Sequence, residues 1–449
     1  MNLDPESLNI LSEAAAKLTQ GFQHLPDVQS RDAASRSSEI LNQVATALAE
    51  DYPYHHPFYL GQMLKPPDPL PQLAYTLAMC LNPNNHALDG GRASSVMERD
   101  VVKELAAMVG WSEALGHLCS GGTIANLEAL WVAREVTHGR TIVASSQAHY
   151  THGRCCEVLQ APFQSVPCTS AARMDINCLR QLLEQGDIGT VVATLGTTGL
   201  GAVDALDEIL SLREKYQFRL HVDAAYGGYF KFAENLSPET QRQYDLMAEA
   251  DSIVIDPHKH GLQPYGCGCV LFNDPSVASV YKHDSPYTYF TSEELHLGEI
   301  SLECSRPGAA AVALWATLQR FPLSKGGEFA QRLEASRRAA LKLAAWLDLQ
   351  ERFRLITKPE LDIVVWLVTA SSASQSSKRA QEFFDAAEEE DLHLALLKVP
   401  RFIAEATTGI SDWDQETVTC LRACLMKPEH DLWMPQILDK LAAVSAAFS

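Results

Sequence analysis

Short apolar runs alternate with helical patterns through the middle of the chain, and this alternation restricts the possible folds more than any other feature. Segments with helical periodicity, such as MDINCLRQLLEQG and ALDEILSLREKYQ, lie between the runs. Continuous apolar strands that alternate with helices are typical of a mainly parallel sheet covered on both faces. We therefore predict an α/β fold whose strands are TIVASS (141–146), TVVATLG (190–196), RLHVDAA (219–225), SIVIDP (252–257) and CGCVLF (267–272).

Polar or glycine-containing segments follow four of these runs, namely SSQAHYTH, GTTGLG, DAAYGGY and DPHKHG. In open α/β sheets, ligands bind beyond the carboxyl ends of the strands. We therefore expect the functional site where these four segments meet.

The parts of the chain on either side of this region show other patterns. Two helical patterns and a proline-rich stretch come first, followed by expected helices at about 71–81 and 94–109. Ser94 or Ser95 is the expected N-cap of the second helix, and Gly110 its end.

After residue 325 a long amphipathic helix precedes the strand-like segments LDIVVWLV, LHLALLKVP and TVTCLRACLM and a final helix, while SSASQSSKRAQ resembles a solvated turn. This mixture favours a smaller α+β domain. We expect an N-terminal helical segment (1–60), a large α/β domain (61–325) and a small C-terminal α+β domain (326–449).

The charge balance disfavours two classes of partner. The chain has 56 acidic and 36 basic side chains, a formal net charge of −20. Such a surface repels phosphate backbones and anionic lipid, so we expect neither nucleic acid nor membrane as a partner. The start of the chain has no signal-peptide pattern and no run reaches 18 apolar residues, which predicts a cytoplasmic protein. The 11 cysteines are scattered, so we expect reduced thiols and no metal site.

Lys259 follows an apolar strand in the segment DPHKHG (256–261). Most lysines in such loops are ordinary surface residues. The alternative is an amine that forms a Schiff base, which requires partial desolvation to supply the neutral form. The lysine alone does not decide between the two.

Asp223 ends the strand RLHVD, with the small residue Ala225 behind it. A carboxylate at a strand end can cap a helix. In an enzyme that uses pyridoxal 5'-phosphate (PLP), it would instead keep the pyridine nitrogen protonated, which makes the ring an electron sink. Asp204 and Asp207 are weaker candidates because both resemble helix-start residues.

Further candidates surround these two residues in the sequence. The segment SGGT (Ser120, Gly121, Gly122 and Thr123) opens a helix, where exposed N–H groups and hydroxyls suit a phosphate, although simple N-capping is the alternative. His149 is a candidate to stack on a ring, with His152 as the competitor. Thr197 and Thr198 are candidates to hydrogen-bond a cofactor or substrate, or form only a glycine-rich turn.

In combination, these segments resemble the group II PLP-dependent amino-acid decarboxylases, which include aromatic-amino-acid, glutamate and histidine decarboxylases. The resemblance rests on SGGTIANLEAL, SSQAHYTH, ATLGTTGLGAVD, HVDAAYGG, DPHKHG and SLECSRPGAAAVALW in that order, and on HPFYLGQM and PELDIVVWLV. It implies the fold-type I, aspartate-aminotransferase-like architecture and PLP as cofactor.

The resemblance also implies roles for individual residues. Lys259 would bind the cofactor covalently, with His258 beside it. Asp223 would pair with the pyridinium, His149 would stack on the ring, and the SGGT segment (120–123) would hold the phosphate.

The family's active sites lie between two subunits, which implies a homodimer with shared sites. The expected cross-interface parts are Cys304 to Gly308, HPFYLGQ and HALDGG, and residues 1–50 would be a dimerisation arm.

The activity implied by the resemblance is decarboxylation of an L-amino acid to its amine and CO₂ through an external aldimine and a quinonoid. In animal members a loop tyrosine favours the amine product, and here neither Tyr287 nor Tyr289 can be aligned with it. The alternatives are therefore an aldehyde synthase, another fold-type I lyase or aminotransferase, or a catalytically silent scaffold.

The substrate is not specified by these patterns. His86, Asp89, Phe58 and Tyr59 are candidate selectors of the substrate side chain, or ordinary loop residues.

Overall fold

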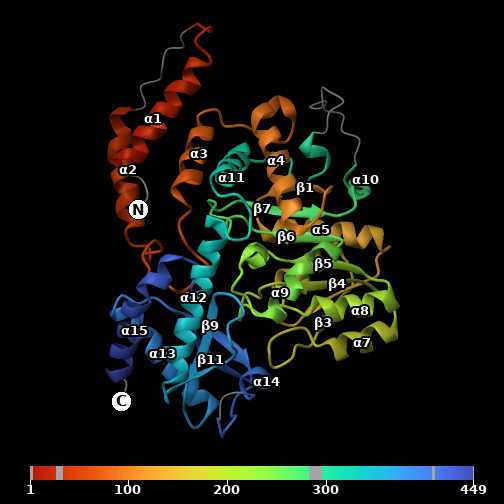
Figure 1. The fold of residues 1–449 in the computed structure, drawn as a ribbon, viewed down its shortest axis with the longest axis vertical. Coiled ribbons are helices and arrows are strands. Elements are labelled where there is room, and N and C mark those ends of the chain that lie inside the picture. Colours follow the sequence, from red (N-terminus) through yellow and green to blue (C-terminus); the bar gives the residue numbers. More distant parts are fainter. Residues whose placement is uncertain (1–3, 27–33, 283–295, 407–409, 448–449) are drawn as a thin grey trace.

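The computed structural model of this protein describes residues 4–26, 34–282, 296–406 and 410–447. Two β-sheets organise the described chain, as Figure 1 shows. The larger sheet has seven strands in the order β1-β7-β6-β5-β4-β2-β3, and the smaller has four in the order β10-β11-β9-β8. The predicted α/β class is confirmed.

The larger sheet is mostly parallel. Strands β2 to β6 pair in parallel through β3-β2-β4-β5-β6, while β7 runs antiparallel to both β6 and β1. Each of the five predicted runs forms a strand, and β1 and β3 are strands that the apolar pattern did not predict. The strands are β1 (Leu115–Cys119), β2 (Thr141–Ser145), β3 (Phe163–Val166), β4 (Ile188–Thr194), β5 (Arg219–Asp223), β6 (Ser252–Ile255) and β7 (Gly268–Phe272).

Helices cover both faces of this sheet. Successive residues of β2 point to opposite sides, so Val143 packs in one apolar cluster while Ile142 and Ala144 pack in another. This double coverage explains why the central strands are apolar throughout. The helices that precede or follow these strands are α4 (Arg92–Val109), α5 (Gly122–Val136), α6 (Thr151–Leu159), α7 (Ile176–Gln185), α8 (Leu206–Tyr216) and α9 (Pro238–Asp245).

Helix α4 differs from the prediction at its start. Its N-cap is Gly91, and Ser94 lies inside the helix. The Ser94 hydroxyl donates to Asn85 Oδ1 (2.5 Å), so the expected cap residue ties the helix to the preceding loop instead. The predicted end is confirmed, because Gly110 has a φ of 113° that favours glycine.

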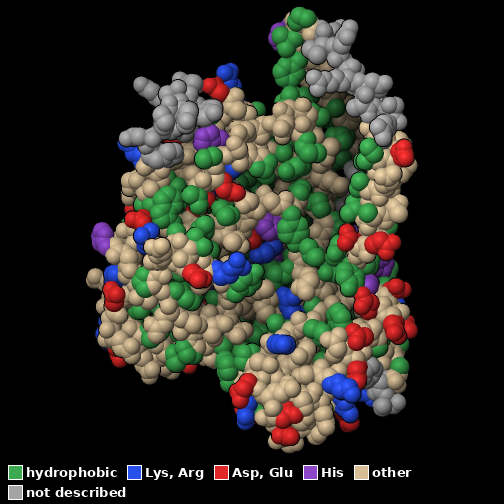
Figure 2. Space-filling model, turned by 180° about the vertical axis from the view of Figure 1, so that it is seen from behind, with side chains coloured by type: hydrophobic (Ala, Val, Ile, Leu, Met, Phe, Trp, Pro, Cys, Tyr) green, Lys and Arg blue, Asp and Glu red, His purple; other side chains and the backbone are tan. Residues whose placement is uncertain are grey.

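The N-terminal helices α1 (Pro5–Gln20) and α2 (Ala34–Leu48) stand at one side of the molecule (Figure 1). Helix α1 contacts α3 (Pro69–Met79). Helix α1 has no buried residue, and apolar side chains such as Leu8, Ile10 and Leu41 are exposed. Seen from behind in Figure 2, hydrophobic side chains also gather along this projecting part.

The C-terminal part places helices against an antiparallel sheet. The long helix α12 (Glu328–Asp348) packs on this sheet and on the final helix α15 (Glu429–Ala447). The strands are β8 (Phe353–Leu355), β9 (Ile363–Val368), β10 (Ala395–Pro400) and β11 (Thr417–Cys424).

The predicted turn SSASQSSKRAQ is wrong, because most of it is the start of helix α13 (Ala373–Glu389). Ser372 is the N-cap, and its side chain accepts from the N–H of Gln375. Ser376 is buried and donates to the Val368 carbonyl (2.7 Å), so serines here cap and anchor a helix.

The remaining described helices are α10 (Ala278–Tyr281), α11 (Gly308–Arg320) and α14 (Arg401–Ala404). Across the described residues, no helix combines the length and the apolar character needed to cross a bilayer.

Candidate active site

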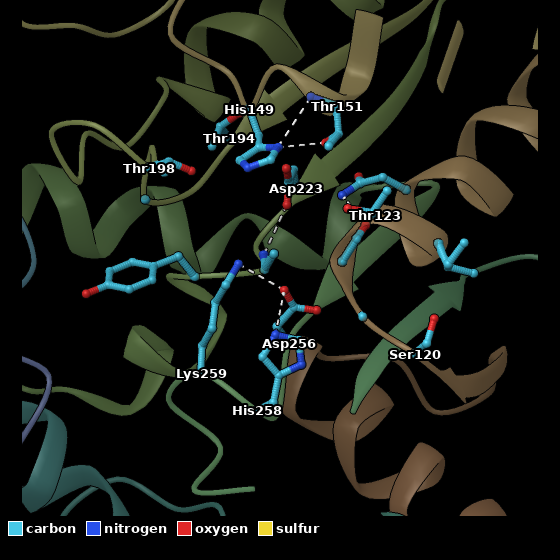
Figure 3. Close-up of a pocket in the computed structure, with 17 residues that line it drawn as sticks. Ser120, Thr123, His149, Thr151, Thr194, Thr198, Asp223, Asp256, His258 and Lys259 are labelled. Atoms are coloured by element: carbon cyan, nitrogen blue, oxygen red, sulfur yellow. Dashed lines mark hydrogen bonds and ion pairs between the residues drawn. The ribbon is translucent and has the colours of Figure 1, made fainter. Parts of the chain in front are cut away.

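A cavity of about 320 Å³ opens at the carboxyl ends of the central strands. Segments that follow β1, β2, β4, β5 and β6 form its wall, and Figure 3 shows their polar side chains converging on it. Ten of the candidate residues named from the sequence lie on this wall: Ser120, Gly121, Gly122, Thr123, His149, Thr198, Asp223, Ala225, His258 and Lys259. The structure brings these residues together, and the roles expected for them remain predictions.

Lys259 lies just beyond β6 and is held by a carboxylate. Its Nζ is 2.9 Å from Asp256 Oδ2, and the side chain of Asp256 is only 3% exposed. The other oxygen of Asp256, Oδ1, has no hydrogen-bond partner among the described residues. Sequence reasoning did not single out Asp256, although it belongs to the same DPHKHG segment, so its position in the motif was the available signal.

Asp223 ends β5 and is almost fully buried. Its Oδ1 accepts the N–H of Ala225 (3.1 Å), and its Oδ2 lies 2.9 Å from Nε2 of His152. Burial alone would raise the pKa of Asp223, but the hydrogen bond and charge of His152, together with Lys259, hold that pKa well below its ordinary value. The carboxylate is therefore ionised at neutral pH.

His149 presents one ring nitrogen as an acceptor and leaves the other as a donor. The backbone N–H of Thr151 donates to its Nδ1 (3.3 Å), and the Thr151 hydroxyl lies 2.7 Å from the same atom. Because a backbone N–H can only donate, Nδ1 is unprotonated and the neutral ring carries its proton on Nε2. Burial lowers the pKa of His149, which favours this neutral form. His152, the competing candidate, does not line the cavity and instead contacts Asp223.

Helix α5 points its N-terminus at the cavity. The N-cap is Gly121, which has no side chain with which to cap the first N–H groups. A Cβ on Gly122 would lie 2.6 Å from Asp256 Oδ2, so a larger residue there would displace the carboxylate of Asp256. Uncapped N–H groups at a helix N-terminus bind anions such as phosphate. The N–H of Ser120, one residue earlier, already donates to Glu303 Oε2 (2.8 Å).

The loop after β4 separates the two threonine candidates. Thr198 lies on the cavity wall, whereas the buried Thr197 accepts the N–H of Ala202 (3.0 Å) and holds the turn. Thr194, which sequence reasoning missed, also lines the cavity, and its buried Oγ1 has no partner among the described residues. Arg422 of β11 donates to the Thr198 carbonyl (2.6 Å) and so braces this loop from the small sheet.

Asp204 has a structural role away from the cavity. It accepts the N–H groups of Met174 (2.7 Å) and Thr194 (2.8 Å), and burial raises its pKa to about 6. It does not cap α8, whose N-cap is Ala205. Asp207 lies in the first turn of α8, as its helix-start pattern predicted.

The candidate substrate selectors lie elsewhere. Phe58, Tyr59, His86 and Asp89 do not line this cavity, and Tyr59 lines a second one with Tyr52 and His393. Tyr287 and Tyr289 lie outside the described residues. Within the described ranges, no cluster of three or more His, Cys, Asp or Glu side chains could hold a metal ion.

The residues present fit PLP. The cavity offers an amine on Lys259, an ionised carboxylate on Asp223 and a helix N-terminus for a phosphate. The unpartnered Oγ1 of Thr194 and the space kept open by Gly122 are polar and steric features that a bound ligand would use.

Comparisons with known proteins agree with this chemistry. The family model described as "Pyridoxal-dependent decarboxylase conserved domain" matches residues 23–369. An L-tyrosine decarboxylase of Enterococcus faecium is 28% identical to this chain, with 94% of this chain and 89% of that protein covered.

Two solved structures share the fold. The crystal structure of Oryza sativa TDC with PLP and tryptamine has a TM-score of 0.77 at 16% identity and covers 99% of each chain. The structure of Rhodiola rosea 4-hydroxyphenylacetaldehyde synthase has a TM-score of 0.75 at 18% identity, covering 98% of this chain and 99% of that one. Because the family model spans well over half of the chain, this protein belongs to the pyridoxal-dependent decarboxylase family and is a fold-type I, PLP-dependent amino-acid decarboxylase.

Proposed function

We propose that this enzyme converts an L-amino acid to its amine and CO₂, with Lys259 as the residue that binds PLP. One observation carries this proposal. The amine of Lys259, the carboxylate of Asp223 and the uncapped N-terminus of α5 meet in a single cavity. These groups match the aldehyde, the ring nitrogen and the phosphate of the cofactor.

When bound, PLP supplies an electron sink for the pair of electrons released as CO₂ leaves. The protein must supply binding, orientation and proton control. Asp223, ionised and buried, would hold a proton on the pyridine nitrogen. Nε2–H of His149 would donate to the substrate carboxylate and orient it.

Lys259 needs a proton acceptor before it can react. Only the neutral amine attacks an aldehyde, and Asp256 Oδ2 lies 2.9 Å from its Nζ. Asp256 would accept that proton and return it when the amine is released. This role would explain why a buried carboxylate stands beside the lysine.

The substrate side chain is best sought among aromatic L-amino acids, because the Enterococcus faecium relative is an L-tyrosine decarboxylase. The aldehyde synthase remains the second candidate, because the Rhodiola rosea enzyme shares this fold. A panel of L-amino acids assayed for CO₂, amine, aldehyde and ammonia separates the two, since aldehyde with ammonia would contradict simple decarboxylation.

A homodimer with shared sites would also explain the projecting N-terminal helices. Their exposed apolar residues, including Leu8 and Leu41, need a partner surface, and a second copy would supply it. We also propose that residues 1–60 form this arm, 61–325 the cofactor-binding domain and 326–449 a smaller domain.

The experiment that tests the site is reduction of the PLP-loaded enzyme with borohydride followed by peptide mapping. We expect the label on Lys259, and we expect Lys259→Ala to lose the label and nearly all turnover. Lys342→Ala, which changes an exposed lysine paired with Asp431, is the matched control and should keep both. A label on another residue, or full activity of Lys259→Ala, would contradict the assignment.

A further inference from the structure

We propose that His152 is a positioning residue for Asp223: it holds the carboxylate in one orientation, and ionised, toward the pyridine nitrogen of the cofactor. This inference rests on the proposed function, because it needs the cofactor to bind in this cavity. It gives a role to a histidine that does not line the cavity.

The contact is short and closed to solvent. His152 Nε2 lies 2.9 Å from Asp223 Oδ2, and their side chains are 1% and 6% exposed. An ionised carboxylate can only accept, so the proton of this hydrogen bond belongs to His152. Hydrogen bonds to a charged group in a buried setting are stronger than those between neutral groups.

The hydrogen bonds to Asp223 leave room for a ligand. Oδ1 accepts one N–H from Ala225 and Oδ2 accepts one from His152, while each carboxylate oxygen can accept twice. Figure 3 shows the carboxylate of Asp223 between His149 and Lys259. With both oxygens anchored, the carboxylate cannot rotate freely, and its remaining acceptor sites keep a constant direction.

A single helical turn organises both histidines. The N–H of His152 donates to the carbonyl of His149 (3.1 Å), and Thr151 between them holds the ring of His149. The turn that begins α6 therefore places one histidine in the cavity and the other behind the carboxylate. Nδ1 of His152 has no hydrogen-bond partner among the described residues, so Asp223 is the contact that its ring serves.

The other charged and titratable groups near this pair do not replace His152. Lys259 and His149 line the cavity. The charge of Lys259 helps to lower the pKa of Asp223, and the charges of Asp223 and Lys259 act in opposite directions on the pKa of His149. His221, two residues earlier on β5, is bonded to Asn126 and Ser252, and burial lowers its pKa to about 3, so it stays neutral. His152 is thus the side chain that donates a hydrogen bond to Asp223 in the described structure.

The chain contains a matched control pair. His117 Nε2 lies 2.9 Å from Glu128 Oε2, and both side chains are fully buried. Neither residue lines the cavity. Removing this contact would cost stability as removing His152 would, but it should leave cofactor binding unchanged.

The test compares His152→Leu, His152→Phe, His152→Gln and the control His117→Gln with the wild type. The measurements are the dissociation constant of PLP, from titration of the apo protein, and the absorption band of the bound cofactor without substrate. The side chains in His152→Leu and His152→Phe cannot donate a hydrogen bond. We expect both variants to raise the dissociation constant of PLP about ten- to a hundredfold and to shift the absorption band of the bound cofactor. His152→Gln, whose side-chain amide can donate, should keep most of the wild-type affinity for PLP. His117→Gln should lower the melting temperature but keep the wild-type constant and band.

The proposal would be overturned if folded His152→Leu or His152→Phe bound PLP with the wild-type dissociation constant and showed the wild-type absorption band. It would also be overturned if His152→Gln bound PLP no more tightly than His152→Leu and His152→Phe. The loss of affinity would then come from the changed side-chain shape and not from the lost hydrogen bond. Borohydride labelling of the wild type separates this result from the proposed function. An unlabelled Lys259 contradicts both, whereas a labelled Lys259 beside unaffected His152 variants contradicts only the role of His152.

Discussion

The cavity of the seven-stranded sheet and the core of the four-stranded sheet bury very different side chains. Asp223 and Asp256 lie buried at the cavity, with His152 behind Asp223. Among the described residues, Asp256 Oδ1 and Thr194 Oγ1 at the cavity have no hydrogen-bond partner. Around the small sheet the largest buried side chains are aromatic, such as Trp366, Phe353 and Phe383.

This contrast indicates that the cavity serves the chemistry, whereas the core around the small sheet mainly stabilises the fold. Burying charge is costly unless a partner compensates it, so buried carboxylates that face a cavity are typical of a functional site. Buried apolar side chains stabilise the folded state but offer no group that can react or bind a charged ligand. Changes in the two regions should therefore affect different measurements.

The largest expected effect on stability is in the apolar core around the small sheet, where helix α13 packs. Phe383 is fully buried with its ring 5.4 Å from that of Phe353, so Phe383→Ala should lower the free energy of unfolding by about 3–5 kcal/mol. The folded fraction should still bind PLP with wild-type affinity. Denaturant unfolding and PLP titration measure the two quantities, and Leu349→Ala, at an exposed position, is the control with little change. A weaker affinity of folded Phe383→Ala for PLP would contradict this separation of stability from cofactor binding.

The opposite pattern is expected at the cavity. Asp223→Asn keeps the shape but removes the charge, so turnover should fall about 10²–10³-fold, as for loss of one electrostatic contact in an active site. The melting temperature of the apo protein should fall less than that of Phe383→Ala, because the asparagine side chain fills the same space and can still accept the N–H of Ala225. Steady-state kinetics and thermal unfolding test this, with Asp207→Asn, at a partly exposed position in the first turn of α8, as the control. Near-normal turnover would remove the carboxylate from the mechanism.

The smallest effect concerns pH. Burial lowers the pKa of His221, in strand β5 of the large sheet, and of His430, at the start of α15, to about 3 each. Below about pH 6.5 the unfolded chain binds protons that these folded groups do not, so stability present above that pH is lost as pH falls toward 3. Each histidine contributes a slope of up to about 1.4 kcal/mol per pH unit.

His221→Gln and His430→Gln should each flatten this dependence by a similar amount, because both regions bury a neutral histidine. Unfolding of the apo protein by denaturant between pH 4 and 7 measures the slope. His24→Gln, beyond the end of α1 and exposed, should leave it unchanged. Equal slopes for wild type and His221→Gln would show that burial of this ring is not what couples folding to pH.

Much of the fold could be predicted because it depends on local pattern. Continuous apolar, β-branched runs identify strands covered on both faces, and each predicted run forms one. The two missed strands lack that pattern: β1 contains a buried histidine, and β3 (FQSV) is an edge strand whose first three residues are exposed. The serine-rich start of α13 was mistaken for a turn because serine is polar, whereas its neighbours Ala373, Ala380 and Phe383 are buried.

The amino-acid sequence by itself determined the sheet type, the strand ends that carry polar residues, and a lysine and an aspartate suited to PLP. Local periodicity and motif order contain that information, because they depend on neighbours along the chain. Tertiary structure alone decided that His152, 71 residues from Asp223, is its partner, and that Thr194 rather than Thr197 faces the cavity. These contacts depend on side-chain direction and on distances across the sheet, which no spacing along the chain specifies.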